Sequence, residues 1–178
     1  MKKILFFFFS VSILFSCNND KKVYEKNLSH FKNLIEEINI YFIDSTINNL
    51  EISNYYTDDF VFYSYPVGHK KGVETAKVDY INNLKQMKKM NMLINIGHSI
   101  YLPGITEESY VLDGSVRLYY GATISMDTNI VEFSGYQTIN FEEGKISGIW
   151  EWVDYGGVSS QLNQFIIGGP SGPKFELF

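Results

Sequence analysis

The chain has 178 residues, of which 45% are hydrophobic and 16% aromatic, and its formal net charge at pH 7 is −5. Its length fits one domain, and its apolar content is enough for a sizeable core. Binding to nucleic acid needs a concentrated basic surface. The chain has a single arginine, Arg117, and its lysines cluster only as pairs, so the composition excludes a nucleic-acid partner.

The N-terminus has the layout of an export signal. A basic head, Met1-Lys2-Lys3, precedes residues 4–15, which are apolar apart from two serines. This run is too short to span a bilayer, which needs ~20 residues, but it fits the core of a signal peptide. The following Leu14-Phe15-Ser16-Cys17 resembles a bacterial lipoprotein lipobox, with a bulkier residue than usual at Phe15.

The lipobox resemblance implies that residues 1–16 are a lipoprotein signal peptide and that Cys17 carries the lipid. It also implies a lipid-anchored membrane protein of the bacterial cell envelope, facing the periplasm or the exterior. Cys17 is the only cysteine, so it cannot form a disulfide within the chain. An ordinary signal peptide with an incidental cysteine, or an uncleaved anchor, remains the alternative.

The mature chain would carry 13 basic and 20 acidic residues, a net charge of −7. We expect residues 17–22 to be a polar tether, residues 23–162 to form one domain, and residues 163–178 to form a C-terminal tail rich in Gly and Pro.

The first half of the domain predicts three helices and one strand. Residues 24–42 place apolar side chains at steps of three and four, which indicates an amphipathic helix. Asp44 or Ser45 could cap a second, shorter helix. Residues 60–65 are aromatic and β-branched and predict a strand that Pro66-Val67-Gly68 ends. A third helix should follow from Val73 to Met87.

The second half predicts four long strands, over residues 92–102, 110–125, 130–141 and 145–154. The turn signals between them are Pro103-Gly104, Asp127-Thr128-Asn129 and Glu142-Glu143-Gly144. Asp154 is placed to cap a short helix over residues 158–162. Helices followed by a run of antiparallel strands indicate an α+β fold.

The last strand carries a family resemblance. Residues 143–162 combine an acidic-Gly-Lys-Ile turn, an aromatic strand, a carboxylate and a closing Gln-Leu. With the earlier helices, the acidic pair and the Pro-Gly turn, they resemble the SnoaL-like branch of the nuclear-transport-factor-2-like fold over residues 27–162. The resemblance implies a cone in which three N-terminal helices pack on a curved antiparallel sheet, with one pocket at the open end.

Isomerases of this superfamily use a carboxylate just before a Pro-Val-Gly turn and a second acid on the penultimate strand. Here Tyr65 takes the first place, and the second falls at Gln137 or Tyr136, with Gln137 favoured because it shares a face with Ile139. Neither tyrosine nor glutamine is a competent base near neutral pH. Steroid-isomerase-like proton transfer is therefore not expected.

Epoxide hydrolases and cyclases of the superfamily use a carboxylate on the last strand, which here falls at Glu151. The hydrolases also need an Arg and an Asp two residues apart, but Arg117 is followed by Tyr119. Strand alternation groups Glu151 with Ile149 and Val153, against Trp150, Trp152 and Asp154. If the Glu151 face points inward, Glu151 is a candidate general acid or base. If the tryptophans point inward, Glu151 is a solvated carboxylate that could pair with Arg117.

The side chains expected to reach the pocket are polar or aromatic: Tyr41, Tyr65, Tyr80, His98, Tyr120, Gln137 and Glu151. The three histidines have no metal-ligand spacing, and no glycine-rich phosphate loop links a strand to a helix. We therefore expect no metal and no cofactor.

Three functions fit the sequence. The favoured one is a membrane-anchored protein whose pocket binds a small, largely apolar molecule. One alternative is an acid/base enzyme of cyclase, isomerase or hydrolase type that uses Glu151. The other is a protein-interaction module that presents the Trp150 and Trp152 face, or the C-terminal tail, to another envelope protein. A homodimer is compatible with each.

Overall fold

The computed structural model describes residues 2–126 and 129–167, and the side chains of residues 19–126 and 129–163. The elements in order are α1 (Lys2–Ile43), a 3-10 turn (Ser53–Tyr55), β1 (Tyr56–Ser64), β2 (Val73–Ala76), α2 (Lys77–Lys89), β3 (Met92–Ile105), β4 (Leu112–Met126), β5 (Asn129–Glu142), β6 (Lys145–Val153) and α3 (Tyr155–Ile167). Of the expected tail at residues 163–178, residues 163–167 belong to α3 and residues 168–178 lie outside the described residues.

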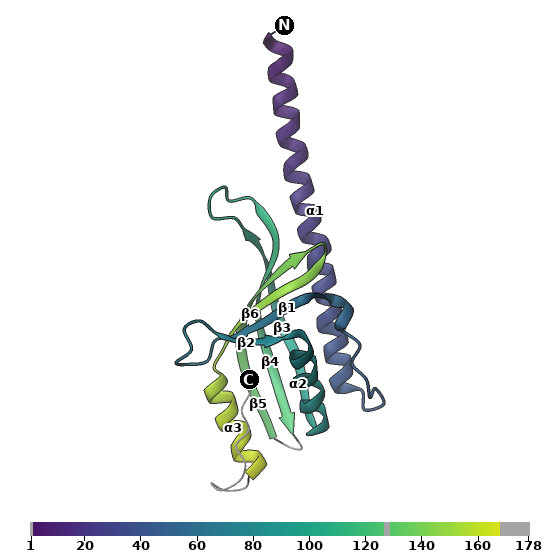
Figure 1. Ribbon diagram of the computed structural model, residues 1–178, viewed down its shortest axis with the longest axis vertical. Helices are drawn as coiled ribbons and strands as arrows, with labels where there is room; N and C mark the ends of the chain where they lie inside the picture. The colour runs from purple at the N-terminus through teal and green to yellow at the C-terminus, as the bar shows by residue number, and fades with distance from the viewer. Residues whose placement is uncertain (1, 127–128, 168–178) are drawn as a thin grey trace.

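Helix α1 is a single helix of 42 residues. Its C-terminal half packs on the domain, whereas its N-terminal half stands clear of it (Figure 1). The predicted apolar stripe forms the contact, because Phe31, Leu34, Ile38 and Phe42 are all buried. Within the described residues, we find no helix that is both long and apolar enough to cross a bilayer.

The predicted second helix is wrong. Residues 44–52 form a turn and an irregular segment, and only the 3-10 turn follows. The Oδ1 atom of Asp44 accepts hydrogen bonds from the backbone N of Thr46 (2.8 Å) and from its hydroxyl (2.7 Å), which closes a local turn. Lys88 of α2 donates to the backbone oxygens of Tyr41, Asp44 and Ile47. These bonds satisfy the carbonyls at the end of α1 without a further helix.

The six strands form one mixed sheet in the order β2-β1-β6-β5-β4-β3. Strands β1 and β6 are parallel, and every other neighbouring pair is antiparallel, so the expectation of an entirely antiparallel sheet is corrected. Strand β2 takes residues that we expected to begin the third helix. Its β-branched Val73 and Thr75 suit an edge strand, and α2 begins only at Lys77.

The predicted turn at Pro103-Gly104 is also wrong, because β3 continues to Ile105 with an irregularity in its register there. Strand β3 lies at the edge of the sheet, where a proline without an N–H is tolerated. The turn at Glu142-Glu143-Gly144 is confirmed. Glu143 and Gly144 have φ of 51° and 80°, and Glu142 pairs with Lys145.

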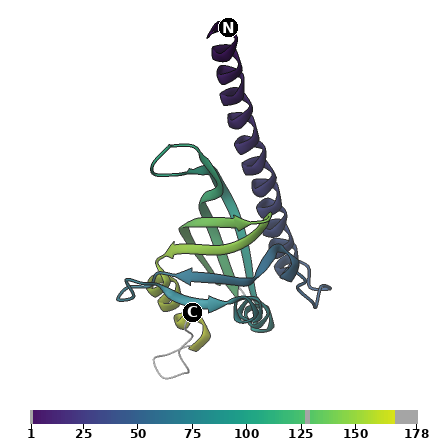
Figure 2. The same ribbon diagram turned by 45° about the horizontal axis from the view of Figure 1, so that its top comes forward.

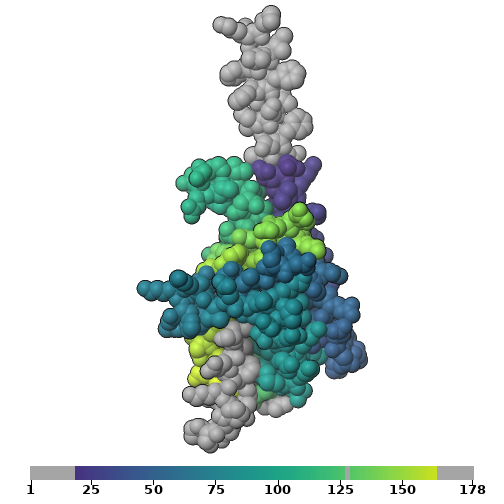
Figure 3. Space-filling view, in the orientation of Figure 1, coloured from purple at the N-terminus to yellow at the C-terminus, as the bar shows by residue number. Residues whose placement is uncertain are grey.

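The curved sheet wraps around α1 and α2, and α3 lies near one end of the sheet, beside β5 (Figure 2). Two helices therefore precede the long strands, and the third follows them. The space-filling view shows the strands and α2 packed into one continuous body (Figure 3). The core lies between the helices and the inner face of the sheet, and its largest fully buried side chains include Phe42, Tyr56, Phe60, Phe62 and Leu118. The α+β cone is confirmed.

Candidate functional site

Strand β6 sets the orientation of the candidate site. Its alternating pattern buries Ile149 (2% exposed) and Glu151 (8%) on the inner face of the sheet. On the outer face, Trp150 stacks on Tyr63 with ring centroids 5.0 Å apart, and Trp152 stacks on Tyr65 at 4.7 Å. This result decides between the two orientations left open by the sequence, since Glu151 points inward.

Four elements bring polar side chains to Glu151. Strands β5 and β6 pair so that Gln137 lies directly opposite Glu151. Tyr120 reaches across from β4, and Tyr155 is the first residue of α3, four residues after Glu151 in the chain. On the other side, Ser64 of β1 pairs with Glu151 in the parallel register.

The Glu151 carboxylate accepts three hydrogen bonds inside the domain. Its Oε1 accepts from the Tyr120 hydroxyl (2.6 Å) and from Gln137 Nε2 (2.5 Å), and its Oε2 accepts from the Tyr155 hydroxyl (2.5 Å). A carboxylate offers about four acceptor positions. This set, the Glu151 cluster (Glu151, Tyr120, Gln137 and Tyr155), therefore leaves one position on Oε2 for a further donor.

The tyrosines around Glu151 are held in the protonated form. Burial, and then the negative charge of Glu151, raises the pKa of Tyr120, of Tyr155 and of Tyr80 above the ordinary value. Their hydroxyls are therefore hydrogen-bond donors throughout the physiological pH range. Such phenols can hold a carboxylate in place, but they are poor acids.

The cluster forms part of the wall of a cavity of about 100 Å³. Side chains from α1, α2, α3 and five strands line it: Ile38, Phe62, Tyr80, Leu84, Met87, Ile94, Ile96, Tyr120, Ala122, Ile124, Phe133, Gln137, Glu151, Val153 and Tyr155. Glu151 is the only charged side chain among these lining residues. The cavity is therefore an apolar space with one polar corner.

The structure brings together four of the seven predicted pocket residues, Tyr80, Tyr120, Gln137 and Glu151. Their part in binding or catalysis stays a prediction. The other three lie elsewhere, and each for a different physical reason.

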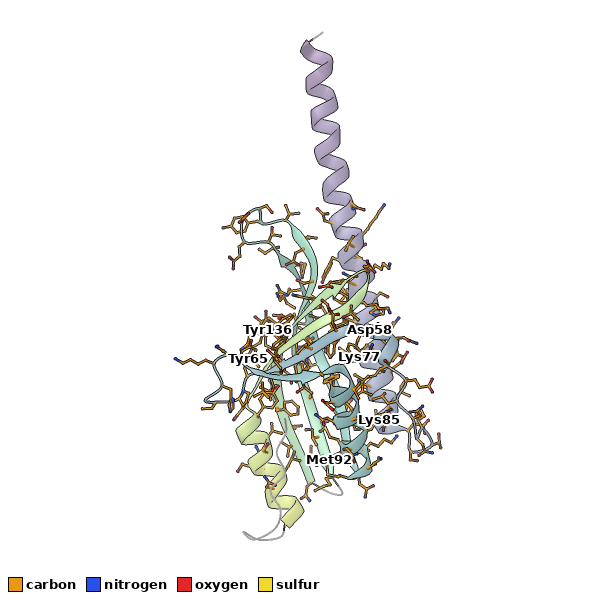
Figure 4. All side chains as sticks on the ribbon, in the orientation of Figure 1. Asp58, Tyr65, Lys77, Lys85, Met92 and Tyr136 are labelled. Atoms are coloured by element: carbon orange, nitrogen blue, oxygen red, sulfur yellow. The ribbon has the colours of Figure 1, made fainter. Side chains whose placement is uncertain are left out.

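Tyr65 lies on the outer face, because the alternation along β1 gives the inward place to its neighbour Ser64. Figure 4 shows Tyr65 and Tyr136 where β1, β6 and β5 meet, and both rings contact Trp152. Tyr41 is buried, but its ring lies under the ammonium group of Lys88, 4.3 Å from the centroid, at the end of α1.

His98 follows a register irregularity in β3 between Ile96 and Ser99, which turns it away from the cavity. Its side chain is exposed and lines a shallow groove of about 390 Å³ that also includes Glu132 and Thr123. In the part of the chain that the structure describes, no three His, Cys, Asp or Glu side chains gather as a metal site would require.

Sequence reasoning missed Tyr155 and Ser64. The available signal for Tyr155 was its place directly after the expected cap residue Asp154, four residues beyond Glu151. That cap is confirmed, since Asp154 Oδ1 accepts a hydrogen bond from the backbone N of Gly157 at 2.9 Å. Ser64 is fully buried beside Glu151, and its hydroxyl has no partner among the described side chains.

Arg117 is not among the residues that line the cavity. Its nearest carboxylate is Asp113, with Nη2 and Oδ2 3.9 Å apart. The arginine position of the hydrolase site therefore has no counterpart at the Glu151 cluster.

No family model matches the chain, and no relative is found among curated proteins. Solved structures do resemble it. A proposed polyketide cyclase from Xanthomonas campestris pv. campestris has a TM-score of 0.57 and 10% identity, covering 79% of this chain and 98% of its own. A nuclear-transport-factor-2-like protein from Anabaena variabilis has a TM-score of 0.52 and 13% identity, covering 72% and 89%.

The chain has the fold of SnoaL-like and nuclear-transport-factor-2-like proteins. A proposed SnoaL-like polyketide cyclase from Jannaschia sp. agrees, with a TM-score of 0.54 and 11% identity over 83% of this chain and 94% of its own. At these identities the likeness concerns the fold alone, since this fold supports many functions. The function of this domain has to be argued from its own cavity.

Proposed function

We propose that the protein is a lipid-anchored envelope protein whose cavity binds a small, largely apolar molecule. The observation that carries the binding proposal is the Glu151 cluster, a buried and pre-arranged polar corner in an otherwise apolar cavity. Ligand sites typically combine apolar walls with a few well-placed polar groups. The unused acceptor position on Glu151 Oε2 would receive a hydroxyl or N–H group of the ligand.

The size of the cavity limits the ligand. An apolar cavity of about 150 Å³ is known to hold benzene, and the cavity here measures about 100 Å³. The fit is therefore to a molecule with about one ring. A polyketide with several fused rings would require the walls to move apart, so the cyclase label of some structural neighbours does not transfer directly.

The membrane part of the proposal rests on Cys17. The first buried side chain of α1 in the described region is Asn27, whose Nδ2 donates to the backbone oxygen of Gly114 (2.9 Å). At 1.5 Å per helical residue, Cys17 lies ~15 Å before this anchor point. A lipid on Cys17 would hold the domain close to the membrane surface.

The anchor is tested with Cys17→Ala. We expect this variant to appear in the soluble envelope fraction or as an unprocessed precursor, because it lacks the attachment site for the lipid. Wild-type fractionation and migration of the variant would disprove the anchor and leave the cavity proposal untouched.

The cavity is tested with benzyl alcohol, a one-ring neutral probe, by isothermal titration calorimetry on the purified full chain. We expect saturable binding with one site per chain. Ala122→Leu extends a lining side chain into the cavity and should weaken binding at least tenfold in a folded protein. Thr123→Leu, on the opposite face of β4, is the matched control and should keep the wild-type affinity. Equal binding by wild type and Ala122→Leu would contradict the proposal.

A second candidate is an acid/base enzyme that uses Glu151. The observation in its favour is that a buried carboxylate with a free acceptor position lies at the cavity wall. Glu151→Gln separates the two functions. An enzyme would lose turnover and keep its affinity for a neutral ligand, whereas a binding protein would have no turnover to lose.

A further inference from the structure

We infer that the ligand is a small organic cation, an ammonium group carried on an apolar body of about one ring. This inference rests on the proposed binding function and names the chemical class of its ligand. Three features of the cavity support it: an uncompensated buried carboxylate, the absence of basic lining side chains, and the aromatic walls.

The carboxylate of Glu151 has no cationic partner in the described part of the chain. The three ion pairs found there join Lys21 to Glu25, Lys77 to Asp58 and Arg117 to Asp113. The three groups that donate to Glu151 are two phenols and an amide, all of them neutral. Burying a charge without an opposite charge is costly, and a ligand cation would supply the missing charge.

None of the lining side chains is basic. Two nearby lysines on α2 are directed elsewhere, because Lys77 pairs with Asp58 and Lys88 caps the end of α1. Figure 4 shows Lys77 beside Asp58, where α2 meets β1. No lysine or arginine among the lining residues therefore competes with a ligand cation or attracts an anion.

Aromatic rings supply the rest of the wall. Phe62 and Tyr80 lie with ring centroids 4.9 Å apart, and Tyr120 and Phe133 lie 6.3 Å apart. The faces of such rings attract cations. An ammonium group can donate to Glu151 Oε2 while its apolar body fills the space among these rings. The net charge of −5 also favours the approach of cations over anions.

The test uses three probes that share one ring and differ in charge at pH 7. These are benzylamine (cation), benzyl alcohol (neutral) and benzoate (anion), measured by isothermal titration calorimetry on the full chain. We expect benzylamine to bind at least tenfold more tightly than benzyl alcohol, and benzoate to show no saturable binding. If benzyl alcohol binds as tightly as benzylamine, or more tightly, the inference is overturned and the binding function stands. If none of the three binds, the binding function itself fails.

Two variants that each remove one negative charge show which residue causes the preference for benzylamine over benzyl alcohol. Glu151→Gln should reduce the ratio of the affinities for benzylamine and benzyl alcohol to about one. Glu132→Gln removes the same charge from an exposed position on β5 outside this cavity and should leave the ratio unchanged. An unchanged ratio in folded Glu151→Gln would overturn the inference. If Glu151→Gln does not fold, the probe series on the wild-type chain still decides it.

Discussion

The two faces of strand β6 differ in what their side chains do. Inward-facing Glu151 is 8% exposed and has three hydrogen-bond donors, and it forms the one charged point of a cavity. Its outward-facing neighbour Trp152 is 41% exposed and stacks on Tyr65. Trp150, Glu151 and Trp152 thus alternate between an aromatic outer surface and a buried polar site.

This difference shows where function can be sought. The outer aromatic rings satisfy one another by stacking face to face, so their contacts are complete without a ligand. The inner face has an acceptor position and an unfilled volume that its own side chains do not use. The interaction-module hypothesis for the outer face stays a prediction. The open acceptor position and the unfilled volume both lie on the inner face.

The largest expected difference between the two faces of the sheet is in how much a packed aromatic side chain contributes to the free energy of unfolding. Phe62→Ala on the inner face should lower the free energy of unfolding by about 3–5 kcal/mol, because a fully buried aromatic side chain is lost. Tyr63→Ala, the next residue, should lower it by only about 0.5–1.5 kcal/mol, the value of a stacked aromatic pair. Urea denaturation of the two variants measures the difference. Equal losses would mean that the two faces do not differ as described.

A pair of glycines gives the next contrast. A Cβ atom on Gly135 would lie 2.5 Å from the Tyr120 hydroxyl, whereas one on Gly121 would contact nothing within 4 Å. We expect Gly135→Ala to displace Tyr120 from Glu151 and to cost about 1–3 kcal/mol through overpacking. Gly121→Ala, on the outer face, should change the free energy of unfolding by no more than about 0.5 kcal/mol. Similar effects from both would contradict the placement of the Tyr120 ring.

The buried tyrosines predict a stability loss at high pH. Tyr120 and Tyr155 have pKa values raised by burial and by Glu151, so the unfolded chain loses their protons first, near pH 10. Their contribution is complete below that pH, and it is lost as the pH rises towards the folded-state pKa values. Each should lower the free energy of unfolding by about 1.4 kcal/mol per pH unit. In urea denaturation above pH 10, Tyr120→Phe should flatten the slope by that amount; an unchanged slope would contradict its burial.

The smallest effect is expected on the outer face. Trp152→Phe keeps an aromatic ring beside Tyr65 and should change the free energy of unfolding by less than about 1 kcal/mol. It should also leave the affinity for benzyl alcohol unchanged. A large loss of affinity would show that the outer face takes part in binding, against our account.

The sequence was informative where the pattern is local. The alternation of Trp150, Glu151 and Trp152 predicted which residues of β6 share a face, although not which face points inward. Gly144 and Asp154 predicted the turn before the strand and the cap after it. These features depend on neighbouring residues only, so they can be recognised without knowledge of the fold.

Prediction from the sequence failed where contacts between distant segments determine the local structure. The helix expected after Asp44 is replaced by a turn whose carbonyls bond to Lys88, more than forty residues further along the chain. The parallel pairing of β1 with β6, and the register irregularity that turns His98 outward, also arise from tertiary contacts. Four of the seven predicted pocket residues reach the cavity, because strand alternation placed three of them and helix spacing placed Tyr80.

The most direct test of the central claim is a crystal structure of the full chain with benzyl alcohol bound. The account predicts electron density for the ring inside the cavity, in contact with Phe62 and Phe133, and the hydroxyl within hydrogen-bond distance of Glu151 Oε2. Density against Tyr65 and Trp152 on the outer face, with the inner cavity empty, would contradict it.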